Sequence, residues 1–287
     1  MPEKIYIPLQ QHSIQADLYG DFSASTQDVI VMSHGLGGEK QLGLADFAEQ
    51  YQQWGYRVCV FDHRGFGESR GAVPQLVDKN SQLKDWQTVI HYLKQHYGVQ
   101  HSQLILWGYS FSGAHVLTLA SESYFKAVIA NFPHADGLAS LALYPKKYLL
   151  PASFKALQDL IYAPFGHVKT MPVVAENRFA ILAGADSFQG YTDLIPHDVH
   201  WHNAVPARIV ATIGFYRPTQ VAHKISNPTL VVGAQQDSLI PIKATRKMAK
   251  KIPQGQYIEL DCGHFDLFDP VFKSQLLRQH HSFLAAL

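Results

Sequence analysis

The chain of 287 residues contains only two cysteines, Cys59 and Cys262. Two cysteines cannot form the disulfide framework of a small secreted domain, and they are too few for a cysteine-rich structural zinc site. The longest apolar runs, such as residues 29–32 and 104–107, are far too short to cross a bilayer. The opening, MPEKIYIPLQ, lacks the basic and apolar parts of a secretory signal. The sequence therefore predicts a soluble protein of a reducing compartment, the cytoplasm.

An excess of charge of either sign is also missing. The 24 Lys and Arg residues nearly balance the 23 Asp and Glu residues, which leaves a formal net charge of +1. Such a chain offers no broad attraction to a nucleic-acid backbone or to an anionic membrane, so we expect neither as a partner. Hydrophobic residues make up 47% of the chain, enough for a large core and too many for an intrinsically disordered protein.

The order of apolar patterns indicates a mostly parallel sheet with helices on both faces, because short β-rich runs alternate with longer helical stretches. Residues 5–9 and 14–19 are expected to form an antiparallel pair in front of it. Further strands are predicted at residues 29–32, 57–61, 103–107, 127–131, 229–233 and 256–260. Helices are predicted at residues 42–54, 81–96, 112–121, 241–250 and 270–285. The length suits one large α/β domain with an insertion, although two small domains would also fit.

Residues 133–227 interrupt this alternation with prolines, aromatic residues and irregular helical fragments. We interpret this segment as the insertion. Its aromatic side chains include Tyr148, Phe154, Tyr162, Phe165, Phe179 and Phe188. We expect most of these six in the core of the segment itself and a minority of them in the lining of a pocket.

The most informative segment is Leu104-Ile-Leu-Trp-Gly-Tyr-Ser110-Phe-Ser-Gly-Ala, in which a buried strand runs into a helix through a turn at Ser110. A nucleophile at such a turn needs small neighbours, because its backbone is strained and the strand and helix approach closely. Gly108 and Ser112 provide them. On its own the pattern also suits a serine that caps a helix. A turn centred on Ser112 fails, because Ser110 stands where a glycine is needed.

Two glycine-containing loops follow other predicted strands. His34-Gly-Leu-Gly-Gly38 leaves backbone N–H groups free to hold an oxyanion, although a glycine-rich turn can also serve tight packing alone. His34 itself is expected to be a structural loop residue. The loop Asp62-His-Arg64-Gly-Phe-Gly-Glu-Ser69 is expected to be architectural, with Arg64 paired to nearby carboxylates.

A base and an acid that could activate a serine lie further along the chain. Asp237 follows one predicted strand and His264 the next, and the 27 residues between them leave room for one helix and one strand. Taken singly, Asp237 could cap a helix and His264 could be an ordinary loop residue. Asp136 is an alternative acid, whereas Asp261 and Asp266 lie too close to His264 along the chain. We interpret Cys262 as a packed thiol.

Together these motifs, with Ser110, Asp237 and His264 in that order, resemble the α/β-hydrolase superfamily, although Ser112 replaces the usual second glycine of the turn. The resemblance implies an α/β-hydrolase fold with a core of residues 1–132 and 228–287 and a mainly helical cap of residues 133–227. It further implies a Ser110–His264–Asp237 triad, an oxyanion hole formed by the Leu36 and Phe111 N–H groups, and no cofactor.

Residues 74–86, 205–208 and 215–218 are also similar, in a less specific way, to bacterial and fungal hydrolases of esters or thioesters. The expected activity is hydrolysis of a small, largely apolar ester or thioester through an acyl-enzyme. The same triad would also support acyl transfer, lactone opening or peptide cleavage, and the fold can serve as a non-catalytic ligand-binding protein. His197-Asp-Val-His200-Trp-His202 invites a metal interpretation, but we prefer a polar loop and expect no metal.

Overall fold

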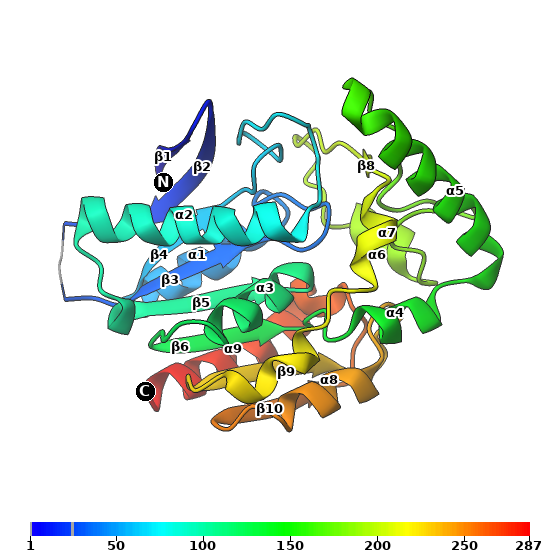
Figure 1. Cartoon of the computed structure of the whole chain (residues 1–287). Coiled ribbons are helices and arrows are strands. Elements are labelled where there is room, and N and C mark those ends of the chain that lie inside the picture. Colours follow the sequence, from blue (N-terminus) through cyan, green and yellow to red (C-terminus); the bar gives the residue numbers. More distant parts are fainter. Residues whose placement is uncertain (1, 24–25) are drawn as a thin grey trace.

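The computed structural model describes residues 2–23 and 26–287, and its centre is an eight-stranded sheet (Figure 1). Its strands are β1 (Glu3–Leu9), β2 (His12–Tyr19), β3 (Val29–Ser33), β4 (Arg57–Phe61), β5 (Leu104–Tyr109), β6 (Ala127–Asn131), β9 (Thr229–Ala234) and β10 (Gly255–Leu260). They lie in the order β1-β2-β4-β3-β5-β6-β9-β10. The β1–β2 and β2–β4 pairs are antiparallel, as the sequence predicts for the first of them, and the other neighbours are parallel.

The central strands are buried along their whole length, because helices cover both faces of the sheet. Helices α2 (Lys79–Tyr97), α3 (Phe111–Ala120) and α8 (Ile242–Ala249) pack into one apolar cluster with one face. Helices α1 (Leu44–Gln53) and α9 (Pro270–Ala285) pack into another cluster with the opposite face. Short 3-10 turns lie at η1 (His101–Gln103) and η5 (Asp266–Phe268). These layers match the predicted fold class.

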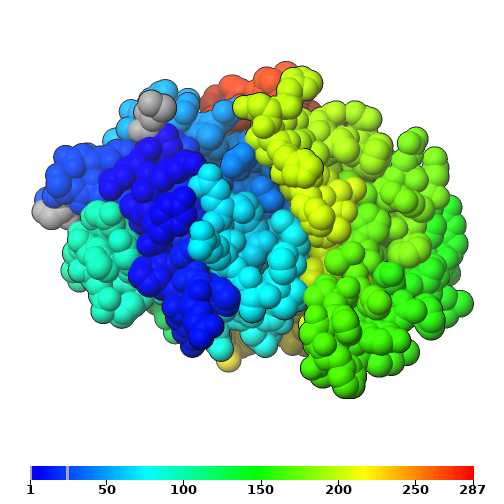
Figure 2. Space-filling view, turned by 90° about the horizontal axis from the view of Figure 1, so that it is seen from above, coloured from blue at the N-terminus to red at the C-terminus, as the bar shows by residue number. Residues whose placement is uncertain are grey.

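The segment between β6 and β9 lies beyond the carboxyl ends of the parallel strands and forms one end of the molecule (Figures 1 and 2). Its elements are α4 (Gly137–Leu143), α5 (Lys146–Tyr162), η2 (Ala163–Phe165), β7 (Thr170–Met171), α6 (Ser187–Thr192), β8 (Val205–Pro206), α7 (Ile209–Ile213), η3 (Pro218–Gln220) and η4 (Ala222–Lys224). The expectation of irregular fragments is wrong for α5, which is 17 residues long. Its prolines do not break it, because Pro145 precedes the helix and Pro151 removes only one backbone hydrogen bond.

The buried Asp159 carboxylate joins α5 to the residues that precede β7 and α7. The Asp159 carboxylate accepts hydrogen bonds from the Arg208 guanidinium at 2.6 and 3.1 Å and from the backbone N–H groups of Lys169 and Arg208. Burial alone would raise the pKa of Asp159, but these donors hold it below its ordinary value. The carboxylate therefore holds α5 against β7 and α7.

Candidate active site

Ser110 lies at the sharp turn between β5 and α3. Its φ of 55° is in the left-handed region that residues other than glycine seldom adopt. A Cβ atom at position 108 would lie 2.2 Å from the Ser112 carbonyl oxygen, so this turn requires Gly108. The Ser110 side chain makes no capping hydrogen bond to α3, which argues against the helix-cap alternative. Its hydroxyl is left for another partner.

That partner is His264, whose Nε2 lies 2.9 Å from Ser110 Oγ. His264 Nδ1 lies 2.7 Å from Asp237 Oδ2, and both side chains are buried. Strands β9 and β10 are parallel neighbours with Ala234 opposite Leu260, so their following loops meet at one edge of the sheet. When Nδ1 donates to Asp237, the lone pair on Nε2 faces the serine hydroxyl.

The Asp237 carboxylate is held in place by its own loop. Its second oxygen, Oδ1, accepts hydrogen bonds from the Leu239 and Ile240 N–H groups, both at 2.8 Å. The Tyr109 hydroxyl donates to the His264 carbonyl oxygen at 2.9 Å and so positions the histidine loop. Sequence reasoning missed Tyr109, because its partner lies 155 residues away in the chain.

The alternative acids have other partners. Asp136 accepts hydrogen bonds from Leu138 N–H and Ala139 N–H at the start of α4 and forms an ion pair with Arg217 at 2.9 Å. Asp261 accepts from the Gln236 amide at 2.8 Å, and Asp266 accepts from Gly263 N–H at 2.7 Å. Asp237 is therefore the acid that the structure brings to His264.

Cys262 and His34 fit the structural roles expected of them. Burial raises the pKa of the Cys262 thiol to about 12, so the side chain stays a protonated thiol. Burial lowers the pKa of His34 to about 3, so the ring is neutral, and its Nδ1 lies 2.8 Å from the Gly35 carbonyl oxygen. Arg64 pairs with the buried Asp85 at 2.6 Å, as expected for an architectural loop.

The loop after β3 lies beside Ser110, because β3 and β5 are parallel neighbours with Ser33 opposite Gly108. Leu36 and Phe111 line the same cavity as Ser110. Phe111 is the first residue of α3, so its N–H has no acceptor within the helix. Among the described residues, no loop hydrogen bond uses the Leu36 N–H either. Within the described residues both N–H groups therefore remain available as hydrogen-bond donors in the cavity that Ser110 also lines.

Two aromatic residues from the segment between β6 and β9 hold this loop in place. The Tyr191 hydroxyl donates to the Leu36 carbonyl oxygen at 3.1 Å, and Trp201 Nε1 donates to the Gly37 carbonyl oxygen at 2.8 Å. Trp201 lies between His200 and His202, so the histidine-rich tract provides the tryptophan that supports the loop after β3. Over residues 2–23 and 26–287, His, Cys, Asp and Glu side chains nowhere gather in groups of three that could hold a metal ion.

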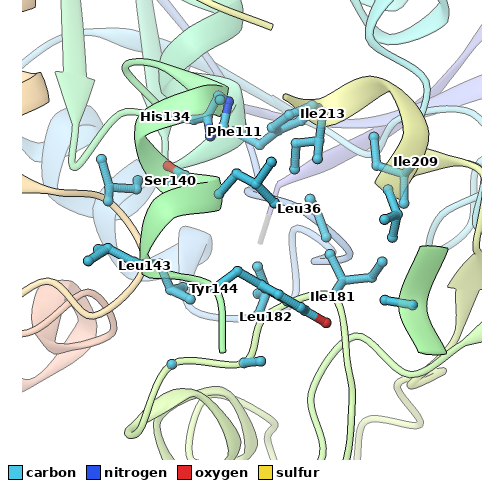
Figure 3. Close-up of a pocket in the computed structure, with 18 of the residues that line it drawn as sticks. Leu36, Phe111, His134, Ser140, Leu143, Tyr144, Ile181, Leu182, Ile209 and Ile213 are labelled. Atoms are coloured by element: carbon cyan, nitrogen blue, oxygen red, sulfur yellow. The ribbon is translucent and has the colours of Figure 1, made fainter. Parts of the chain in front are cut away.

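A cavity of about 210 Å³ is lined by Ser110 and by residues of helices α4, α5 and α7, and Figure 3 shows part of this lining. None of the residues that line it is Asp, Glu, Lys or Arg, and burial lowers the pKa of its one histidine, His134, to about 4. The apolar lining includes Leu36, Leu143, Ala152, Ile181, Leu182, Ile209 and Ile213. An apolar, uncharged chain is therefore the kind of group that this cavity accommodates.

A family model described as alpha/beta hydrolase fold matches residues 28–271. The chain belongs to the α/β-hydrolase family. Quorum-quenching protein AidA of Acinetobacter baumannii is 34% identical over 272 residues, which cover 94% of this chain and 90% of that protein. Thiohydrolase aneE of Aspergillus aculeatus is 38% identical over 85 residues, which cover 30% of this chain and 27% of its own.

The comparison with solved structures agrees with this membership. The α/β hydrolase GrgF from Penicillium superposes with a TM-score of 0.81 at 20% identity, covering 99% of this chain and 98% of its own. At that identity the likeness shows the fold alone. The fold expected from the sequence is confirmed. Within the part of the chain that the structure describes, no helix has both the length and the apolar character needed to cross a membrane.

Proposed function

We propose that this α/β hydrolase is a serine hydrolase that cleaves a small, largely apolar carboxylic ester or thioester. The observation that carries the proposal is the series Ser110 Oγ, His264 Nε2, His264 Nδ1 and Asp237 Oδ2, joined at 2.9 and 2.7 Å. A serine hydroxyl is a weak nucleophile unless a base is in hydrogen-bonding reach, and this arrangement supplies one.

In the first half of the reaction, Ser110 Oγ attacks the substrate carbonyl carbon while its proton passes to His264 Nε2. Asp237 stabilises the imidazolium that forms, and the Leu36 and Phe111 N–H groups bind the tetrahedral oxyanion. The intermediate collapses when His264 returns the proton to the leaving alcohol or thiol. The acyl group then remains on Ser110 as an ester.

In the second half, water attacks the acyl-enzyme and gives a proton to His264. The second tetrahedral intermediate releases the carboxylic acid as the proton returns to Ser110 Oγ. The same acyl-enzyme would acylate an alcohol or amine if one replaced water, so acyl transfer differs from hydrolysis only in the acceptor.

In this proposal, residues 133–227 form a cap over the site. Leu143 from α4, Ala152 from α5 and Ile209 from α7 line the cavity together with Leu36 and Phe111 from the core. Burying apolar substrate surface there contributes about 25 cal/mol per Å². Specificity is then set by the hydrophobic size of the acyl group and not by charge.

The names of two relatives suggest classes of substrate. The printed name of thiohydrolase aneE favours a thioester, but it matches only part of this chain. The name of AidA, a quorum-quenching protein that matches nearly the whole chain, favours a quorum signal as a second candidate substrate. A cyclic ester would suit the same triad, since ring opening differs only in keeping the leaving alcohol attached to the acyl group.

A panel of acyl substrates tests the proposed function. We expect kcat/KM for p-nitrophenyl esters and for N-acetylcysteamine thioesters to rise with acyl length until the cavity is full, and a fluorophosphonate to label Ser110. Lactones of graded side-chain length test the second candidate in the same assay. Folded protein that neither reacts with the fluorophosphonate nor turns over any of these substrates would contradict the proposal.

Filling the cavity should shorten the preferred acyl chain. Ala152 is buried on the cavity side of α5. In Ala152→Phe the added ring should occupy space that a long acyl chain needs, which lowers kcat/KM for long acyl esters by about tenfold or more (about 1.4 kcal/mol) and leaves acetyl esters little changed. Phe154→Ala is the matched control, since Phe154 lies on the same helix but faces outward. If kcat/KM depended on acyl length in the same way in both variants, the result would argue against an acyl site beneath α5.

A further inference from the structure

The exposed apolar side chains of this protein are concentrated at one place. Of the 16 large hydrophobic side chains that are exposed among the described residues, 12 lie between Leu138 and Phe215. Phe154, Tyr162 and Phe165 are among them, so the expectation that the aromatic residues of this segment form its core is wrong for these three. Soluble monomers seldom leave a large contiguous apolar surface uncovered, so this concentration indicates a binding surface.

Helix α5 carries the centre of that surface. Leu150, Phe154, Leu157 and Ile161 are spaced by four, three and four residues, which places them on one side of the helix. We call these four residues the outer face of α5. Their side chains are exposed to 82%, 63%, 54% and 54%. The buried residues Ala152, Ala156 and Asp159 lie on the opposite side, so both sides of α5 are largely apolar although only one is covered.

The apolar surface continues to the rim of the cavity. Leu141 and Leu143 line the cavity and are also 43% and 46% exposed. Ser153 of α5 is likewise exposed and lines the cavity. A second copy of the chain seated here would cover the rim and obstruct access to Ser110. A fluid lipid layer would instead leave apolar molecules free to move from the layer into the cavity.

The charges around the outer face of α5 also favour a lipid surface over a second copy of the chain. Lys146 and Lys147 are exposed at the start of α5, and Lys169 lies beyond its end with Nζ 4.9 Å from the centre of the Tyr162 ring. The only acidic residue between positions 137 and 169 is Asp159, which is buried and paired with Arg208. Apolar side chains flanked by unopposed lysines are typical of helices that lie on anionic lipid.

We propose that the outer face of α5 docks on an anionic lipid surface, with Lys146 and Lys147 among the headgroups and the four apolar side chains below them. The net charge of +1 for the whole chain predicts no membrane partner, but it hides this local excess of positive charge. The docking proposal depends only on the exposed apolar and basic side chains described above. The further step, in which an apolar substrate enters the cavity from the lipid, rests on the proposed hydrolase function.

Vesicle flotation with the full chain tests the docking. We expect binding to vesicles of phosphatidylcholine with about one-third phosphatidylglycerol, weaker binding to phosphatidylcholine alone, and weakening by added salt. Phe154→Glu should weaken binding at least about tenfold, and so should the double variant Lys146→Glu/Lys147→Glu. The matched control is Val271→Glu on α9, because Val271 is exposed to the same 63% as Phe154. It should bind as the unmodified protein does.

Two outcomes would overturn the docking: no binding of the unmodified protein to the anionic vesicles, or an equal loss in Val271→Glu and Phe154→Glu. A dimer in lipid-free sedimentation that Phe154→Glu dissociates would also overturn it and assign the surface to a second copy. Fluorophosphonate labelling of Ser110 in solution is measured on the same variants and should be unchanged. Failure of that labelling in the unmodified protein would contradict the hydrolase proposal and leave the docking result standing.

Discussion

Ser110→Ala should fold normally and lose ester hydrolysis by about 10³-fold or more in kcat. The alanine keeps the backbone turn between β5 and α3 but removes the oxygen that lies 2.9 Å from His264 Nε2. Without that oxygen no acyl-enzyme can form, and the oxyanion donors alone stabilise only a slow direct attack by water. Steady-state kinetics with a chromogenic ester, together with the loss of fluorophosphonate labelling, measures the effect.

Ser140→Ala is the control for this variant. Ser140 lines the same cavity, and among the described residues its buried hydroxyl has no hydrogen-bond partner. Its removal should therefore change kcat by less than about threefold, because the hydroxyl makes no hydrogen bond to His264, Ser110 or Asp237. If folded Ser110→Ala kept near-normal turnover, or if Ser140→Ala were equally inactive, the nucleophile would have to be reassigned.

The sheet and the turn at Ser110 could be predicted because their signals are local. Central parallel strands are buried on both faces, so each appears in the sequence as a nearly continuous apolar run. The strand predicted at residues 103–107 differs from β5 (Leu104–Tyr109) by one residue at its start and two at its end. Gly108 and Ser112 each lie only two residues from Ser110, so their role in the turn can be inferred without tertiary contacts.

The features that sequence reasoning missed depend on partners far away in the chain. Tyr191 and Trp201 reach the Leu36 and Gly37 carbonyl groups across 155 and 164 residues, and no local pattern marks either aromatic side chain. The outer face of α5 was missed for another reason. Aromatic and aliphatic residues are usually buried, so Phe154 was expected in a core, and only the position of α5 at the edge of the molecule leaves it exposed.

Asp237→Asn should lower kcat by about 10⁴-fold, whereas Asp136→Asn should leave it nearly unchanged. The amide oxygen of the new side chain could still accept hydrogen bonds from the Leu239 and Ile240 N–H groups, so the loop should keep its shape. The uncharged amide could no longer stabilise a protonated His264, and an amide N–H facing Nδ1 would favour the wrong imidazole tautomer. Kinetics of both variants under identical conditions, with thermal unfolding as the check on folding, measures the contrast.

Asp136→Asn is a demanding comparison because Asp136 also holds a structural position. An asparagine there would keep an oxygen for Leu138 N–H and Ala139 N–H but would lose the charge that pairs with Arg217. We therefore expect a small fall in the unfolding temperature and little change in kcat. An inactive, folded Asp136→Asn beside an active Asp237→Asn would reverse the assignment. It would require Asp136 to leave both Arg217 and the start of α4 in order to reach His264.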